Sequence, residues 1–360
     1  MKNKKELDVA IWKDISEYSA ISGYEHQLHD LLFKHLHPYV DDVFCDGLMS
    51  VVGVKKQGEL KVLFASHIDE VGFQVKDISE KGYIYLQAIG GLWAHALLAH
   101  QFQIETRQGK KIIGVVGCKP PHGMSEKQKS TVLLMDELYL DLGVTNQEEV
   151  QKLGVEIGNQ VTPYTQFSEM NNHNYLFGKA WDDRCCMAIE LELAKRLVDT
   201  KSEATIYFAG TAQEEVGQRG ARTIAHKINP DISFALDVTN ALDTPFENGD
   251  IQLGKGPVLT LMDASSIAHE ELFKFVEELC LKEAIPFQYS CSKDGGTDNG
   301  NIHKSLKGII GMTISVPCRY MHSSSSIIHK EDMLQTIKLL ELICISLTKE
   351  VVKKIKQYNQ

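Results

Sequence analysis

Apolar strand-like runs alternate with helical segments through the second half of the chain. In such runs, uninterrupted apolar residues predict buried strands, and apolar residues spaced by three or four positions predict helices. The predicted strands cover 204–209, 232–237 and 308–316, and the predicted helices cover 184–198, 219–227, 266–283 and the chain from 331. This alternation predicts an α/β fold, with a mostly parallel sheet covered by helices on both faces.

The first part of the chain has the same character. Helical apolar spacing covers 6–20 and 25–36, and apolar runs at 51–54 and 60–65 predict two strands. The second of these runs is almost entirely apolar, so we expect it in the interior of the sheet.

Between these two parts, residues 73–163 have a different texture of short alternating segments broken by glycine and proline. That pattern predicts a small inserted β-barrel or β-sandwich. At 360 residues and 43% hydrophobic composition, the chain is long enough for such an insertion. We therefore expect a catalytic domain built from 1–72 and 164–360, interrupted by a barrel domain.

Charge and cysteine content narrow the classes of protein to which the chain can belong. A net charge of −10 without long basic blocks argues against nucleic acid or an anionic membrane as a partner. The amino terminus has no apolar signal-peptide core, and no apolar run approaches the ~20 residues of a membrane helix. We expect a soluble, cytoplasmic protein whose eight scattered cysteines are reduced thiols.

Titratable residues follow four of the predicted strands and the short segment that ends at Phe177-Gly178. In open α/β sheets, ligands bind at the carboxyl ends of the strands, so these residues should meet at one edge. Taken singly, a histidine usually packs and an aspartate before a helix usually caps it. The group consists of His67, Asp69, Asp182, Asp183, Glu214, Glu215, Asp237 and His322.

Imidazole and carboxylate ligands without thiolates suit an open catalytic site for Zn²⁺, with Co²⁺ or Mn²⁺ as alternatives. The set is too large for one ion and suits two divalent ions that share a carboxylate. Asp69, two residues after His67, is placed to hold the second nitrogen of that imidazole. One of Glu214 and Glu215 can bind metal while the other accepts a proton from water, which is hydrolytic chemistry.

Six segments occur in an order that resembles the M42 metallo-aminopeptidases, also called tetrahedral, glutamyl or deblocking aminopeptidases. A further similar segment, Lys119-Pro120-Pro121-His122, lies in the insertion. The six segments are Ala65–Gly72 (Ala-Ser-His-Ile-Asp-Glu-Val-Gly), Gly178–Arg184 (Gly-Lys-Ala-Trp-Asp-Asp-Arg), Gln213–Ala221, Leu236–Thr239, Asp294–Asp298 and Val316–Ser323.

This resemblance implies a role for each candidate residue. His67 and Asp237 would bind one metal, Glu215 and His322 the other, and Asp182 would bridge them. Glu214 would be the general base, and Asp69 would assist through His67. The resemblance also implies a barrel used for dimerisation, peptide substrates and a hollow tetrahedral dodecamer.

Three departures from the family pattern put substrate preference in question: Trp181, Cys185 and the serine run Ser323–Ser326. We expect the substrate pocket to include the loop 295–300. Arg219 is a candidate partner for an acidic substrate, although a structural ion pair is the more ordinary explanation. The remaining histidines considered, His95, His100, His122 and His303, are interpreted as structural.

Three alternatives to an aminopeptidase remain open on the residues alone. A two-metal amidohydrolase that deacylates N-acylated amino acids would share all the ligands. A metal-independent glycoside hydrolase could use the two glutamates but has no need of the histidines. A non-enzymatic scaffold stapled by metal would show no turnover.

Overall fold

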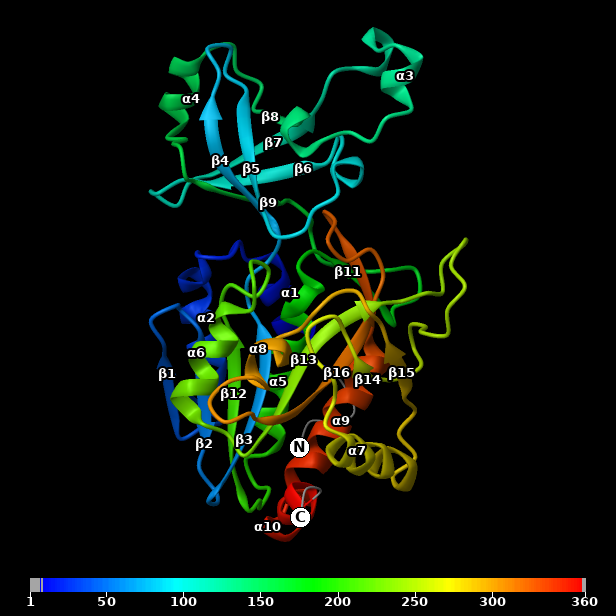
Figure 1. Ribbon diagram of the computed structural model, residues 1–360. Helices are drawn as coiled ribbons and strands as arrows, with labels where there is room; N and C mark the ends of the chain where they lie inside the picture. The colour runs from blue at the N-terminus through cyan, green and yellow to red at the C-terminus, as the bar shows by residue number, and fades with distance from the viewer. Residues whose placement is uncertain (1–6, 8, 358–360) are drawn as a thin grey trace.

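The computed structural model describes residue 7 and residues 9–357, and it divides into a large α/β part and a smaller β-barrel above it (Figure 1). The α/β part is built on an eight-stranded sheet. In spatial order its strands are β1 (Asp42–Cys45), β2 (Val51–Lys55), β12 (Ala204–Thr211), β3 (Leu60–His67), β13 (Ile232–Asn240), β16 (Ile310–Cys318), β14 (Val258–Met262) and β15 (Gln288–Cys291).

The four central strands, β12, β3, β13 and β16, run parallel to one another. Their register aligns Phe64 with Phe208 on one side and with Phe234 on the other, and the three rings stack with centroids 6.5 and 5.4 Å apart. Because the register is shared, the carboxyl ends of these strands lie at one edge. The predicted mostly parallel sheet is confirmed at its centre. β1 and β2 pair antiparallel with their neighbours, and β14 pairs antiparallel with β16 but parallel with β15.

Helices cover both faces of the sheet. Side chains of β3 alternate between the two layers, so that Val62 and Phe64 enter the larger core and Leu63 and Ala65 the smaller one. The smaller core lies under α6 (Arg219–Ile228) and α8 (Asn299–Ile302). The larger core lies under α1 (Val9–Glu17), α2 (His29–Leu36), α5 (Trp181–Arg196), α7 (Glu270–Lys282) and α9 (Lys330–Ser346), with η1 (Glu25–Leu28) before α2 and α10 (Lys349–Lys356) after α9.

Most elements lie close to the predicted ranges. The predicted first helix, 6–20, is shorter in the structure and begins at Val9; residue 6 lies outside the described residues. The strands β1, β14 and β15 were not predicted, and β1 and β15 are only four residues long and partly exposed. None of the helices within the described part of the chain is both long and apolar enough to cross a membrane.

The insertion forms a closed barrel, as predicted, with Phe73, Phe102 and Val161 in its core. Its strands, in order around the barrel, are β4 (Gly72–Ile78), β5 (Ile84–Ile89), β8 (Tyr139–Asp141), β7 (Lys111–Gly117), β6 (Gln101–Glu105) and β9 (Gln160–Pro163). Its short helices are η2 (Ala94–Ala96), η3 (Pro121–Gly123), α3 (Glu126–Lys129), η4 (Met135–Glu137) and α4 (Gln147–Leu153). A separate small sheet contains β10 (Ser168–Glu169), β11 (Tyr175–Gly178) and β17 (Ser326–His329).

Candidate active site

The carboxyl edge of the central strands opens into a cavity of about 780 Å³. His67 ends β3, Asp237 lies in β13 and Asp182 lies in the first turn of α5. The glutamate pair follows β12, and His322 follows β16. Six of the seven predicted site residues line this cavity: His67, Asp182, Glu214, Glu215, Asp237 and His322.

Asp182 lies between the two histidines. Its Oδ1 is 3.0 Å from His67 Nε2, and its Oδ2 is 3.1 Å from His322 Nε2. Burial disfavours the charged carboxylate, but the hydrogen bonds with His322 and His67 outweigh it and lower the pKa of Asp182. The two oxygens thus face two different imidazoles, which is the arrangement that a carboxylate shared by two metal ions requires.

The two glutamates approach one histidine each. Glu214 Oε2 is 3.9 Å from His67 Nε2, and Glu215 Oε2 is 3.8 Å from His322 Nε2. Burial, together with repulsion from the charge of Asp182, raises the pKa of Glu215 to about 8. Burial also raises the pKa of Glu214 well above its ordinary range, with added repulsion from Asp237. Without a cation these carboxylates repel one another, so a cation would stabilise the cluster.

Asp69 lies behind the cavity, fully buried, and does not line it. Its Oδ1 accepts a hydrogen bond from the backbone N–H of Glu214 (3.0 Å). Its Oδ2 accepts one from the backbone N–H of Glu215 (3.2 Å) and one from the hydroxyl of Ser22 (2.6 Å). Oδ1 also lies 3.5 Å from His67 Nδ1, which is closer to the backbone oxygen of Asp69, at 3.0 Å. Asp69 therefore positions the glutamate pair as well as the imidazole.

Two groups of candidate ligand atoms share His67. Those of His67, Asp182 and Glu215 lie within 4.8 Å of one another, as do those of His67, Asp183 and Asp237. Asp183 received no role in the sequence analysis, although its place beside Asp182 was visible. Its Oδ2 accepts the backbone N–H of His67 at 3.2 Å.

These residues fit divalent metal ions. Among the described residues, Glu215 Oε1 and Asp183 Oδ1 are buried without any hydrogen-bond donor. Buried carboxylate oxygens without donors are costly unless a cation contacts them. The donors are imidazole nitrogens and carboxylate oxygens, which suit Zn²⁺, Co²⁺ or Mn²⁺ in an open site.

A loop from the barrel side also shapes the site. The carbonyl oxygen of Gly91 lies 2.5 Å from His322 Nδ1 and orients that ring. At the preceding Gly90, φ is +78° and an added Cβ would lie 3.2 Å from Glu215 Oε2, so only glycine fits without strain. The contact between Gly91 and His322 was not predicted. In the sequence, it is marked only by the pair Gly90-Gly91 after a strand.

The residues expected to shape the pocket have separate positions. Gly295, Gly296 and Thr297 of the predicted loop line the cavity. Trp181 packs between Trp12 and Phe167, with ring centroids 6.4 and 6.0 Å away, and does not line it. Buried Cys185 is likewise absent from its wall, and Ser323–Ser325 line a neighbouring cavity.

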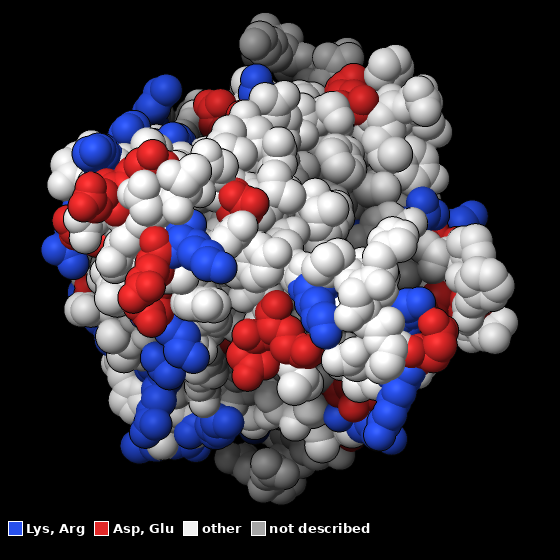
Figure 2. Space-filling model, turned by 90° about the horizontal axis from the view of Figure 1, so that it is seen from above, with Lys and Arg blue, Asp and Glu red and all other residues white. Residues whose placement is uncertain are grey.

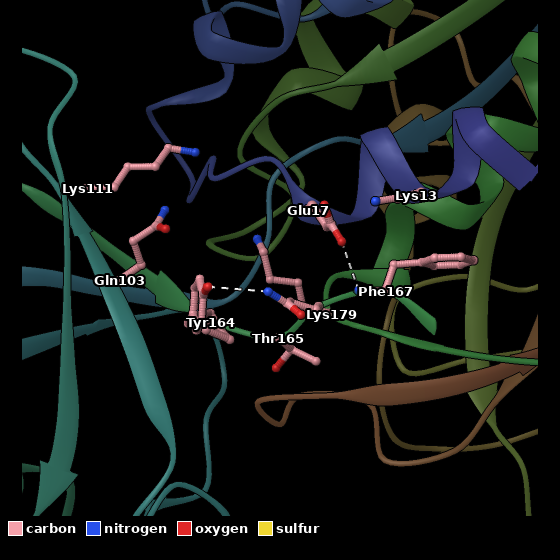
Figure 3. A pocket seen from close by; sticks show the side chains of 10 residues that line it. Lys13, Glu17, Gln103, Lys111, Tyr164, Thr165, Phe167 and Lys179 are labelled. Atoms are coloured by element: carbon pink, nitrogen blue, oxygen red, sulfur yellow. Dashed lines mark hydrogen bonds between the residues drawn. The ribbon is translucent and has the colours of Figure 1, made fainter. Parts of the chain in front are cut away.

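A further cavity of about 330 Å³ lies where the barrel meets the α/β part (Figure 3). Its wall includes Lys13, Lys111 and Lys179 and a single carboxylate, that of Glu17. The Glu17 side chain accepts the backbone N–H of Phe167 at 3.0 Å, as Figure 3 shows. With no histidine and one carboxylate already in use, this cavity offers no metal site.

The chain is similar to known peptidases in both sequence and fold. Residues 49–339 match the M42 glutamyl aminopeptidase family. The chain is 34% identical to the lysyl aminopeptidase of Pyrococcus furiosus over 94% of this chain and 96% of that protein. Its fold matches the TET aminopeptidase of a marine Thaumarchaeota archaeon, with a TM-score of 0.94, 32% identity and coverage of 96% and 98% of the two chains. It also matches the TET1 peptidase of Pyrococcus horikoshii, which can assemble into a tetrahedron or a large octahedral shell, with a TM-score of 0.84, 29% identity and coverage of 94% and 99%.

Proposed function

Since this chain belongs to the M42 family of aminopeptidases, we propose that it removes amino-terminal residues from peptides with the help of two divalent metal ions. The observation that carries the two-metal proposal is the position of Asp182, whose oxygens face His67 and His322 at 3.0 and 3.1 Å. A carboxylate placed in this way can bridge two ions.

The proposed ligands divide into two sets. His67 and Asp237 would hold one ion, Glu215 and His322 would hold the other, and Asp182 would be shared between them. Zn²⁺ is the first candidate, with Co²⁺ and Mn²⁺ as alternatives, because the donors are nitrogen and oxygen.

When bound, the metals supply Lewis acidity toward the scissile carbonyl and make a water easier to deprotonate. Glu214 lines the cavity and is not needed as a ligand, so its carboxylate accepts the proton of the attacking water. The same group, now a carboxylic acid, then gives that proton to the leaving amine. Surrounding carboxylates favour a substrate with a positively charged amino terminus, which suits an exopeptidase.

The decisive experiment replaces the base and leaves the ligands in place. Glu214→Gln should retain two metal ions per subunit and lose at least about a hundredfold in kcat, the range expected for a general base. Metal content is measured by atomic emission and turnover with aminoacyl-anilides, and the exposed Glu148→Gln on α4 serves as the matched control. Near-native turnover of Glu214→Gln with full metal content would refute its assignment as the base.

The proposed assembly is a tetrahedral dodecamer formed through the barrel. The tetrahedron of the Pyrococcus horikoshii TET1 peptidase supports this proposal. Exposed apolar side chains on the barrel, among them Ile113, Val115 and Leu134, provide a surface suited to contact with a second copy.

A further inference from the structure

The wall of the active-site cavity contains further carboxylates besides the proposed metal ligands. Asp250, Asp263 and Asp294 line it together with uncharged residues such as Leu242, Ile251 and Tyr289. No Lys or Arg side chain belongs to this wall in the described part of the chain. Two divalent ions would offset the inner carboxylates, and the outer three would then set the charge seen by a substrate side chain.

Hydrogen bonds from Ser265 and Ser266 hold the side chain of Asp263 in place. It follows β14, and its Oδ1 accepts the backbone N–H groups of Ser265 and Ser266, both at 2.7 Å. The Ser265 hydroxyl donates to Oδ1 at 2.8 Å, and the Ser266 hydroxyl donates to Oδ2 at 3.1 Å.

Asp250 and Asp294 are exposed parts of the same wall. Within residues 9–357, neither carboxylate group forms a hydrogen bond or an ion pair, so both charges are available to a ligand. Two exposed charges near one opening raise the local concentration of cations and lower that of anions.

Two arginines near the cavity, Arg219 and Arg319, are engaged elsewhere, and the exposed Lys293, next to Asp294, does not line the cavity. Arg219, the residue considered as a partner for acidic substrates, donates to Gln213 Oε1 at 3.2 Å and does not line the cavity. Arg319 binds Asp243 through two hydrogen bonds of 2.7 Å. An acidic substrate side chain would therefore lose its water of hydration without gaining a cationic partner.

We propose that this enzyme prefers peptides with a basic amino-terminal residue, lysine or arginine, and discriminates against glutamate and aspartate. This inference rests on the proposed aminopeptidase function and names the substrate class of the same site. The proposed preference differs from the preference for glutamate that the family name, glutamyl aminopeptidase, indicates.

The kinetic test compares lysyl-, leucyl- and glutamyl-anilides on the metal-loaded enzyme. We expect kcat/KM for the lysyl substrate to exceed that for the glutamyl substrate by at least about tenfold, within the range of electrostatic steering. The double variant Asp250→Asn/Asp294→Asn should reduce this ratio several-fold, and the exposed Asp199→Asn after α5 should not. A glutamyl substrate hydrolysed as well as the lysyl one, or a ratio unchanged in the double variant, would overturn the inference.

A second measurement reads the charge of the cavity without any turnover. Cys291 is an exposed thiol in the same wall, and it reacts with methanethiosulfonates to form a mixed disulfide with release of methanesulfinate. A cationic reagent should modify it at least about tenfold faster than an anionic reagent of similar size, and the double variant should narrow this difference. Cys291→Ser provides the background from the other thiols.

The two measurements separate the possible failures. If no anilide is hydrolysed but the reagent rates differ as expected, the proposed function fails and the charge of the cavity is supported. Equal reagent rates at Cys291 in the wild type would overturn the inference even if the enzyme is an active aminopeptidase.

Discussion

Asp69 shows how much one buried carboxylate contributes to this site. It binds the backbone N–H groups of Glu214 and Glu215 and lies beside the ring of His67. Burial disfavours its charge, but the hydrogen bond and the charge of His67 outweigh this and lower the pKa of Asp69. A group that does not line the cavity thus holds the backbone of two residues that do and lies beside the ring of a third.

Asp69→Asn should lower kcat about 10–100-fold, the usual effect of losing a partner behind a metal ligand. An amide can accept at only one of its two positions, so one of the two glutamate N–H groups loses its acceptor. Steady-state kinetics and metal affinity measure the loss. Ser22→Ala is the matched control, because it removes only the hydroxyl that donates to Asp69 Oδ2. Equal effects of the two variants would show that the carboxylate merely fills space.

At the scale of elements, apolar pattern predicted the parts of the fold that depend on burial. β3 and β12 are apolar runs because both of their faces are covered, and the polar residues after them were therefore recognisable as site candidates. The Gly91 carbonyl and the Arg219–Gln213 contact were beyond such reasoning. Backbone carbonyls carry no sequence signature, and the partner of an exposed charge depends on tertiary structure.

A buried ionic cluster joins the loop after β3 to the start of α5. Lys179 Nζ lies 2.6 Å from Glu70 Oε1, and Arg184 Nη2 lies 3.1 Å from the same oxygen. All three side chains are almost fully buried. Arg184 also donates to the backbone oxygens of Ile15 and Ala20, so the cluster ties the amino-terminal segment to the site.

Lys179→Met should destabilise the protein by about 3–5 kcal/mol, because it leaves part of the Glu70 charge unpaired in the interior. The pair of Lys195 and Glu192, 3.3 Å apart on α5, provides the matched control, because Lys195 is 42% exposed and Glu192 keeps a second partner in Arg196. Lys195→Met should cost less than about 1 kcal/mol, as exposed pairs usually do. Chemical denaturation of both variants measures the difference, and comparable losses would contradict a structural role for the cluster.

Asp332, at the start of α9, links stability to pH. It accepts the backbone N–H groups of Gly254 and Gly256, and burial raises its pKa to about 7. In the unfolded chain its pKa is near 3.9, so between about pH 4 and pH 7 the unfolded state loses this proton and the folded state keeps it. The contribution of Asp332 to stability therefore falls as pH rises through this window, by roughly 1.4 kcal/mol per pH unit where the difference is complete, and is constant above it.

Asp332→Asn should remove this fall in stability with rising pH and leave the pH-dependent contributions of other groups unchanged. The measurement is the difference in Tm between variant and wild type at several pH values from 4.5 to 7.5. We expect the Tm of the variant to increase relative to that of the wild type as the pH rises. A constant difference over the whole range would show that Asp332 is already ionised in the folded protein.

The whole molecule presents a barrel surface with no partner in the monomer. Seen from the barrel end, charged side chains of both signs surround wide uncharged areas (Figure 2). On β7 both faces are apolar, because Ile112 and Val116 pack in the barrel core whereas Ile113 and Val115 point outward and are 43% and 41% exposed. Leu134, 62% exposed, adds to the apolar area of the barrel.

If the barrel carries the assembly, one charge on this face should disrupt it without touching the active site. Ile113→Glu should lower the molar mass measured by light scattering, since burying an unpaired carboxylate in an apolar interface is unfavourable. Leu281→Glu, on the exposed side of α7, is the matched control because Leu281 is 66% exposed on the α/β part, and it should leave the mass unchanged. Hydrolysis of short aminoacyl-anilides should survive in the disassembled variant, because every proposed ligand comes from a single chain. A wild-type mass equal to one chain, or an unchanged oligomer in Ile113→Glu, would place self-association elsewhere or exclude it.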